Sequence, residues 1–89
     1  MRSVNYSKQF KKDFKLAKKR GCNMSLLYTV MKKLENEEIL DTEYNYHPLS
    51  GNYKGYLECH LESDWLLIYK IDGQDLYFVR TGTHSDLFS

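Results

Sequence analysis

The spacing of apolar residues changes once along this chain, and the change limits the folds that it can adopt. Up to about residue 38, apolar side chains recur every three or four positions, as in amphipathic helices. After Asn52 they alternate with polar ones, as in strands that bury one face. The sequence therefore predicts an α+β fold in which two helices precede most of the sheet.

A first helix is expected between Ser7, whose hydroxyl can cap it, and Gly21, which can end it in a left-handed conformation. Its apolar side is formed by Phe10, Phe14 and Ala17. Its opposite side is basic and holds six lysines: Lys8, Lys11, Lys12, Lys15, Lys18 and Lys19. Residues 2–6, before the helix, are compatible with a short strand.

A second helix is expected from about Ser25 to Glu38, with Asn23 or Ser25 as its cap. Its apolar face consists of Leu27, Val30, Met31 and Leu34. Because only a few residues separate the two helices, they should form an antiparallel hairpin. Residues 39–51 lack periodicity and contain the only proline, so a loop is predicted there.

Three strands are expected in the remainder, over residues 53–62, 65–71 and 76–81. In the first, Leu57, Cys59 and Leu61 share one face, and the opposite face holds Lys54, Tyr56, Glu58 and His60. Ser63-Asp64 and Asp72-Gly73 supply the turns. The order β-α-α-β-β-β places the helix hairpin on one face of a small, mainly antiparallel twisted sheet and leaves the other face free. A short turn or helix should follow at residues 83–88.

The length of 89 residues predicts a single domain over residues 1–89, since neither half could bury a stable core alone. With 42% hydrophobic and 28% charged residues, a folded chain is expected rather than a disordered one. No apolar run approaches the roughly 20 residues that span a bilayer, and no secretion signal begins the chain, so a cytoplasmic location is expected. Cys22 and Cys59 have no CxxC or metal-type spacing and are expected to be reduced thiols.

The net charge of +1 hides a strong asymmetry along the chain. Residues 1–33 contain ten Lys and Arg and one acid, Asp13, giving +9. Residues 34–89 contain three basic and eleven acidic residues, giving −8. A basic third of this kind suits either the phosphates of a nucleic acid or an acidic protein partner.

All three histidines fall in the second half, at His47, His60 and His84, together with Asp64 and Arg80. RNA carries its own nucleophile, the 2′-hydroxyl, so cleavage needs a base, an acid and a cation for the charged phosphorane. Histidine suits the two proton transfers because its pKa lies near neutral pH. Arginine suits the phosphate because its planar fork binds two oxygens. This set of residues therefore matches metal-free phosphodiester cleavage.

Each of these residues also has a purely structural explanation. A histidine on a polar strand face can simply be solvated, and Arg80 could pair with Asp64 or Glu62. Trp65 suits the core by its strand position, and the lysines suit a solvated helix face. A zinc site is disfavoured because HxH, HxxxH and HExxH spacings are missing, so neither a metal nor another cofactor is expected.

Three blocks of sequence resemble one known family. They are HPLSGNYKGY over residues 47–56, ECHLESDWLLIYK over residues 58–70 and RTGTHSDLF over residues 80–88. In this order and spacing they resemble the YafQ branch of the RelE/ParE toxin superfamily, closely from His47 onward and weakly over the helices. The resemblance implies a RelE-like fold and a toxin of a type II toxin–antitoxin system that cleaves mRNA in the ribosomal A site, leaving a 2′,3′-cyclic phosphate.

The resemblance also implies roles for individual residues. Arg80 would clamp the phosphate and His84 would transfer a proton at the scissile bond, while His47, His60 and Asp64 assist. The implied residues on the substrate side are Trp65, Phe88, which would stack on a base, and Lys54.

The implied partners are the ribosome with its mRNA and a small antitoxin, expected to be a ribbon-helix-helix protein. The complex of this antitoxin with the toxin is expected to bind its own operator DNA. The alternative is a non-enzymatic inhibitor of DNA gyrase on the same fold, as in the ParE branch, which would not need the histidines or Arg80. Codon preference and the division of base and acid among the histidines do not follow from the sequence.

Overall fold

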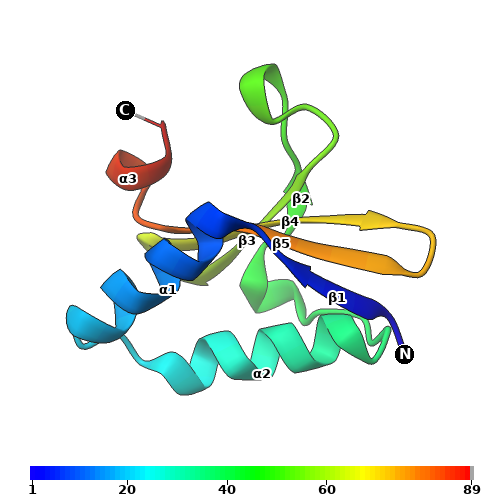
Figure 1. Ribbon diagram of the computed structural model, residues 1–89, viewed down its shortest axis with the longest axis horizontal. Coiled ribbons are helices and arrows are strands. Elements are labelled where there is room, and N and C mark those ends of the chain that lie inside the picture. Colours follow the sequence, from blue (N-terminus) through cyan, green and yellow to red (C-terminus); the bar gives the residue numbers. More distant parts are fainter. Residues whose placement is uncertain (89) are drawn as a thin grey trace.

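The computed structural model describes residues 1–88, which form a helix hairpin, a mixed sheet and a short final helix (Figure 1). The elements in chain order are β1 (Ser3–Tyr6), α1 (Lys8–Lys19), α2 (Met24–Glu35), η1 (Thr42–Tyr44), β2 (His47–Pro48), η2 (Gly51–Tyr53), β3 (Leu57–Glu62), β4 (Trp65–Asp72), β5 (Asp75–Gly82) and α3 (His84–Phe88). The expected β-α-α-β-β-β order is confirmed, with β2 as an addition.

The sheet has the strand order β1-β5-β4-β3-β2. β1 runs parallel to β5, and all other neighbours are antiparallel. Figure 1 shows α1 and α2 on one side of the sheet, whereas α3 and the loop with η2 stand on the other side. We call this second side the open face. The layers are those expected for an α+β fold with one helix-covered sheet face.

The main core lies between the helix hairpin and the sheet. It joins the apolar helix residues to the inward residues of the strands, among them Phe10, Ala17, Leu27, Val30, Cys59, Leu67, Tyr69, Leu76 and Phe78. A smaller apolar cluster lies on the open face and consists of Leu66, Ile68 and Leu87, with Leu49, Tyr53, Tyr56 and Val79 packed against it. Central strand β4 is thus buried on both faces, as its uninterrupted apolar sequence predicted.

Ser7 ties the start of α1 to the sheet. Its hydroxyl oxygen accepts a hydrogen bond from the Phe10 backbone N–H at 2.8 Å and its hydroxyl donates to the Val79 carbonyl at 2.7 Å. The first bond is the cap expected from the sequence. At the other end of the helix, Gly21 has a φ of +80°, the left-handed conformation that glycine adopts without strain.

Two boundaries differ from those expected. α2 ends at Glu35 rather than Glu38, because Glu37 has a left-handed φ of 62° that a continuing helix does not allow. Asn23 occupies the N-cap position, but its side chain makes no capping bond. The predicted loop over residues 39–51 contains strand β2, whose two residues are too few to show a period of two.

A bulge in β5 decides which way Arg80 points. Ile68 pairs with Arg80 and Tyr69 pairs with Phe78, so Val79 is an extra residue in β5. Directly paired residues lie on the same face of a sheet. Arg80 therefore shares the open face with Ile68, although Phe78, two residues earlier, belongs to the core under the helices. Without the bulge the alternation would direct Arg80 toward the core.

Candidate active site

Strand pairing brings distant parts of the sequence into one row on the open face. His47 on β2 lies opposite Glu58 on β3, Glu58 lies opposite Ile68 on β4, and Ile68 lies opposite Arg80 on β5. In the neighbouring row His60 lies opposite Leu66. The structure therefore places His47, His60 and Arg80 on the same face of the sheet, with Arg80 three strands away from His47.

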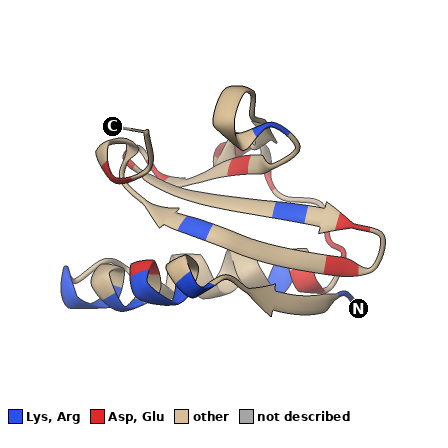
Figure 2. Ribbon diagram, turned by 45° about the horizontal axis from the view of Figure 1, so that its top comes forward, with Lys and Arg blue, Asp and Glu red and all other residues tan. Residues whose placement is uncertain are grey.

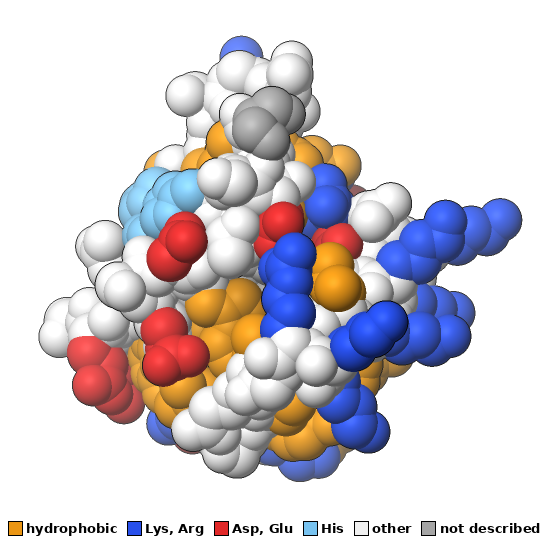
Figure 3. Space-filling view, turned by 90° about the vertical axis from the view of Figure 1, so that its left-hand side faces the viewer, with side chains coloured by type: hydrophobic (Ala, Val, Ile, Leu, Met, Phe, Trp, Pro, Cys, Tyr) orange, Lys and Arg blue, Asp and Glu red, His pale blue; other side chains and the backbone are white. Residues whose placement is uncertain are grey.

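The three imidazoles follow one another closely. The ring centroids of His47 and His60 are 6.1 Å apart, and those of His60 and His84 are 5.8 Å apart. Figure 3 shows the histidine side chains as one continuous patch at the surface, with acidic side chains beside it. A substrate on this face can thus meet several groups that exchange protons near neutral pH.

Asp64 orients His84. One oxygen of its carboxylate, Oδ1, accepts a hydrogen bond from the His84 backbone N–H at 2.9 Å and contacts the ring Nδ1 at 2.6 Å. These bonds, first that from the backbone N–H, hold the pKa of Asp64 below its ordinary value, so the carboxylate is charged at neutral pH. A charged carboxylate only accepts, hence Nδ1 carries the proton and Nε2 remains available to a substrate.

A reciprocal cap holds the helix that begins at His84. The Thr83 backbone N–H donates to the Asp86 carboxylate at 2.9 Å, and the Asp86 N–H donates to the Thr83 hydroxyl at 3.1 Å. Arg20 at the end of α1 forms a salt bridge with Asp86 at 2.7 Å. The arginine first, and then the Thr83 N–H, keep the pKa of Asp86 well below its ordinary value. The final helix is thus attached to both the sheet end and α1.

Glu58 is a site residue that sequence reasoning did not single out. Its carboxylate lies 3.1 Å from His47 Nε2 and 3.8 Å from His60 Nε2, and the residue is only 5% exposed. His60 Nδ1 is buried without a hydrogen-bond partner among the described residues. The alternation of β3 had already placed Glu58 on the face of His60, but the contact with His47 depends on β2. One ligand atom from each of the three residues lies within 4.8 Å of the others, so the group could hold a metal ion.

Arg80 pairs with Asp13 on α1, and not with Asp64 or Glu62. Its Nε donates to Asp13 Oδ2 at 2.7 Å and its NH2 group to Oδ1 at 3.2 Å, a bidentate geometry. The Asp13 side chain is 7% exposed and also accepts from the Thr81 backbone N–H at 3.2 Å. The hydrogen bond with Asp13 raises the pKa of Arg80, which keeps the guanidinium charged. The sequence does contain a signal for a buried role of Asp13, since this acid stands on the apolar side of α1, three residues after Phe10.

Phe88 lies beside the histidines, whereas Lys54 is placed only on the loop that follows η2. The Phe88 ring lies 6.4 Å from the His84 ring and 5.7 Å from the Tyr53 ring, and the residue is 47% exposed. Lys54 is exposed in the turn that follows η2. Phe88 therefore offers an accessible aromatic surface beside a histidine.

Trp65 was expected on the substrate side, and the structure places it in the core instead. The residue is 5% exposed and belongs to the cluster beneath the helices. A nucleobase has no access to it, so the structural explanation of Trp65 as a packing residue holds. Cys59 is also buried, which raises the pKa of its thiol to about 12 and makes it a poor nucleophile.

Together the fold and the site define a small α+β protein with a surface cluster of histidines and carboxylates and, on the same sheet face, an arginine paired with a buried aspartate. A family model described as "Bacterial toxin of type II toxin-antitoxin system, YafQ" matches residues 2–89. The chain belongs to this family of bacterial toxins.

Similar proteins agree with this assignment. The mRNA interferase toxin YafQ of Escherichia coli K12 is 48% identical over 88 residues, covering 98% of this chain and 96% of the relative. The E. coli DinJ–YafQ complex contains a chain with 47% identity and a TM-score of 0.92, with full coverage of both chains. A metal-bound toxin from Helicobacter pylori has 44% identity and a TM-score of 0.91, covering 99% of this chain and 100% of that one. The RelE-like fold implied by the sequence blocks is thereby confirmed.

Among residues 1–88, no helix is both long and apolar enough to cross a membrane.

The attachment of α3 should weaken in acid. The folded-state pKa values of Asp64 and Asp86 are lowered, so each carboxylate adds stability above its unfolded pKa, and this contribution is lost as pH falls through the folded pKa. We expect NMR titration of both carboxyl carbons to give midpoints below the ordinary value of about 3.9. The protection of the Leu87 amide against hydrogen exchange, measured relative to its intrinsic rate at each pH, should fall over the same range, since this amide donates to the Thr83 carbonyl. Midpoints at or above the ordinary value would contradict the described hydrogen bonds.

Proposed function

We propose that this protein is a ribosome-dependent endoribonuclease that cleaves mRNA in the ribosomal A site. The observation that carries the proposal is the set of three adjacent imidazoles on the same sheet face as a clamped arginine. The name of the E. coli relative states that it is an mRNA interferase. A gyrase inhibitor would need neither the imidazoles nor their carboxylate partners.

The chemistry follows from what RNA supplies and what it lacks. A base removes the proton of the 2′-hydroxyl, the 2′-oxygen attacks phosphorus, and a 2′,3′-cyclic phosphate forms as the bond to the 5′-oxygen breaks. An acid protonates that leaving oxygen. His84 and His60 are the proposed acid–base pair, because their rings adjoin and Asp64 leaves Nε2 of His84 available. The pH profiles of single variants would assign the base and the acid.

Arg80 is the proposed phosphate clamp. Its guanidinium is charged, partly exposed and aligned by Asp13, while the apolar Ile68 separates it from Glu58 in the same row. Asp13 uses only some of the five N–H donors of the guanidinium, which leaves others for phosphate oxygens. Asp13 is therefore a positioning residue, since it acts on the substrate through Arg80.

The basic side of α1 supports binding to a large RNA surface. Figure 2 shows Lys and Arg in successive turns along α1, away from the sheet. Ribosomal RNA presents a dense array of phosphates, and each contact with a lysine releases counterions. Phe88 would stack on a base of the A-site codon, a contact that tolerates any base.

The second proposed partner is a cognate antitoxin, as in the E. coli DinJ–YafQ complex. An apolar hollow of about 440 Å³ lies between β1 and the two helices, with Lys11 and Lys15 among its lining residues. Tyr28, 49% exposed, contributes to it. An acidic amphipathic segment of a small ribbon-helix-helix antitoxin would match this surface. We further propose that the complex binds its own operator DNA and that the protein acts in the cytoplasm, where its substrate is made.

Replacing His84 with Gln should abolish most cleavage, because Gln keeps hydrogen-bonding capacity but exchanges no proton. We expect a loss of about 10²- to 10⁴-fold in cleavage of mRNA on programmed ribosomes. Asp13→Asn should lower the rate less, since Arg80 remains but loses its charged anchor. Primer extension on programmed ribosomes measures both effects.

The exposed carboxylate variant Glu43→Gln is a matched control, since Glu43 lies on η1, and it should cleave at the wild-type rate. Folding of each variant is checked by circular dichroism. A folded His84→Gln protein with the wild-type rate would refute the proposed chemistry.

The proposed reaction needs no metal at the site, so a toxin that is treated with EDTA and then desalted should still cleave mRNA on programmed ribosomes held at constant Mg²⁺. Added Cu²⁺ should inhibit, because ligation of His47, Glu58 and His60 would remove their capacity to transfer protons. Glu58→Gln removes one ligand and should raise the Cu²⁺ concentration needed for half-inhibition of whatever activity remains. Loss of cleavage by the EDTA-treated toxin, restored when a metal is added back to the toxin alone, would instead indicate metal-dependent hydrolysis.

A charge placed in the apolar hollow should disrupt antitoxin binding. We expect Tyr28→Lys to weaken the complex with the cognate antitoxin on the order of tenfold or more, since it buries an unpaired ammonium. Thr29→Lys adds the same charge at an exposed position outside this hollow and serves as the control. Calorimetric titration measures both. Equal affinity for the two variants would place the antitoxin elsewhere.

A further inference from the structure

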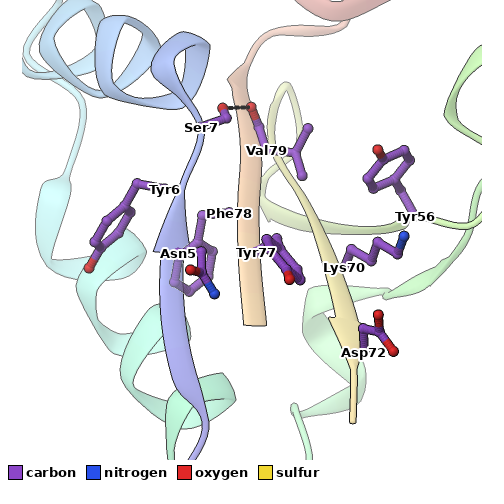
Figure 4. A pocket seen from close by; sticks show the side chains of 9 residues that line it. All are labelled: Asn5, Tyr6, Ser7, Tyr56, Lys70, Asp72, Tyr77, Phe78 and Val79. Atoms are coloured by element: carbon purple, nitrogen blue, oxygen red, sulfur yellow. Dashed lines mark hydrogen bonds between the residues drawn. The ribbon is translucent and has the colours of Figure 1, made fainter. Parts of the chain in front are cut away.

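A second hollow on the open face is not used by the chemistry described so far. It measures about 440 Å³ and lies over β1, β5 and β4 (Figure 4). Asn5, Tyr56, Lys70, Asp72 and Tyr77 contribute side chains to it, and Val79 connects it to the neighbourhood of Arg80. The hollow thus adjoins the catalytic row on the same sheet face.

Strand pairing aligns the polar groups of this hollow. Asn5 lies opposite Tyr77 across β1 and β5, and Tyr77 lies opposite Lys70 across β5 and β4. The Lys70 ammonium lies 5.7 Å from the centre of the Tyr56 ring. Figure 4 shows these side chains next to one another, while Tyr6 points away from them. A second row of polar side chains therefore lies on the open face, formed by Asn5, Tyr77, Lys70 and Tyr56. It runs parallel to the row from His47 to Arg80.

Two groups of this row, the Lys70 ammonium and the Tyr77 hydroxyl, are available to a ligand, whereas the Asn5 amide donates to the Ser3 and Leu76 carbonyls. Within residues 1–88, the Lys70 ammonium forms no ion pair and the Tyr77 hydroxyl forms no hydrogen bond. Asp72 stands at the hairpin end of β4 and would repel a phosphate there. A phosphate is therefore favoured near Lys70 on the side toward Arg80, and not at the hairpin.

Aromatic rings connect the catalytic histidine with this hollow. The ring of His84 lies 6.4 Å from that of Phe88, Phe88 lies 5.7 Å from Tyr53, and Tyr53 lies 6.2 Å from Tyr56. Such a series of rings, with a cation beside it, is the arrangement that binds single-stranded nucleic acid by stacking and phosphate contact. The rings thus form one continuous surface from His84 to the hollow.

We propose that the hollow is a second RNA subsite, which holds a nucleotide of the mRNA next to the pair joined by the scissile phosphate. Its base stacks on Tyr77 or Tyr56 and its phosphate contacts Lys70. This inference rests on the proposed endoribonuclease function and adds a subsite beside the cleaved bond. Because stacking accepts every base, the subsite contributes affinity and alignment without selecting a sequence.

The test compares two RNA lengths with the purified toxin. The probes are 2′-O-methyl oligonucleotides of two and six nucleotides, which cannot be cleaved because the 2′-oxygen is blocked. We expect Tyr77→Leu to weaken binding of the longer probe about tenfold and to leave the dinucleotide unaffected. Lys70→Met should lower the salt dependence of binding of the longer probe, by about 0.7 in the slope of log K against log salt. Fluorescence anisotropy measures both probes.

Matched variants separate the subsite from general effects. Tyr77→Phe keeps the stacking ring and should lose much less binding of the longer probe than Tyr77→Leu, and Lys32→Met removes a lysine on α2, where no change is expected. Unchanged binding of the longer probe by Tyr77→Leu, an equal loss for both lengths, or no measurable binding by the wild type would each overturn the subsite.

The experiments can refute the proposed function without refuting the subsite. His84→Gln should bind both probes with the wild-type length dependence while losing cleavage. A wild-type protein that cleaves no mRNA on ribosomes, yet shows the expected length dependence, would refute the proposed function and leave the subsite in place.

Discussion

The buried carboxylate of Asp13 is the contact on which the arrangement of this protein depends most. It reaches from α1 to β5, where it accepts two hydrogen bonds from Arg80 and one from the Thr81 backbone. Thr81 in turn donates through its hydroxyl to the Leu66 carbonyl on β4 at 2.7 Å. A buried charge is costly unless it is paired and fully hydrogen-bonded, and here both conditions are met. The helix hairpin, the bulged strand and the proposed phosphate clamp are thus joined at one point.

The contact between Asp13 and Arg80 also shows how much of the molecule could be predicted from its sequence, because it depends on a bulge in β5. The helices and long strands follow from periodicity, and residues such as Phe10, Leu27 and Cys59 lie in the core where the pattern placed them. The bulge at Val79 and the two-residue strand β2 leave no periodic trace, because each involves one or two residues. Their positions decide that Arg80 faces outward and that His47 meets Glu58. The residue types of the site were therefore predictable, whereas their contacts depend on registers set by tertiary packing.

Trp65 and Asp13 show that the sequence segment in which a residue lies can mislead about its role in two opposite ways. Trp65 belongs to a motif that resembles a functional block, yet it packs beneath the helices. Asp13 belongs to a lysine-rich helix that suggested only an RNA-binding surface, yet it aligns the residue proposed to clamp the scissile phosphate. Helical spacing distinguishes the two cases, since Asp13 shares its side of α1 with Phe10 and Ala17 while the lysines take the other side. A lone acid on the apolar side of a helix needs a buried cation, and Arg80 supplies it.

Glu58, at the centre of the site, is a second buried carboxylate that needs a positive charge beside it. Its carboxylate is almost fully buried, and the positive charge available to balance it comes from His47 or His60 when either ring is protonated. In the proposed reaction, Glu58 can therefore contact a proton-bearing imidazole on either side of it. A metal ion would satisfy the same three ligand atoms, but it would occupy the lone pairs that proton transfer requires. The two states exclude each other, because each uses the same nitrogen and oxygen atoms to neutralise one buried negative charge.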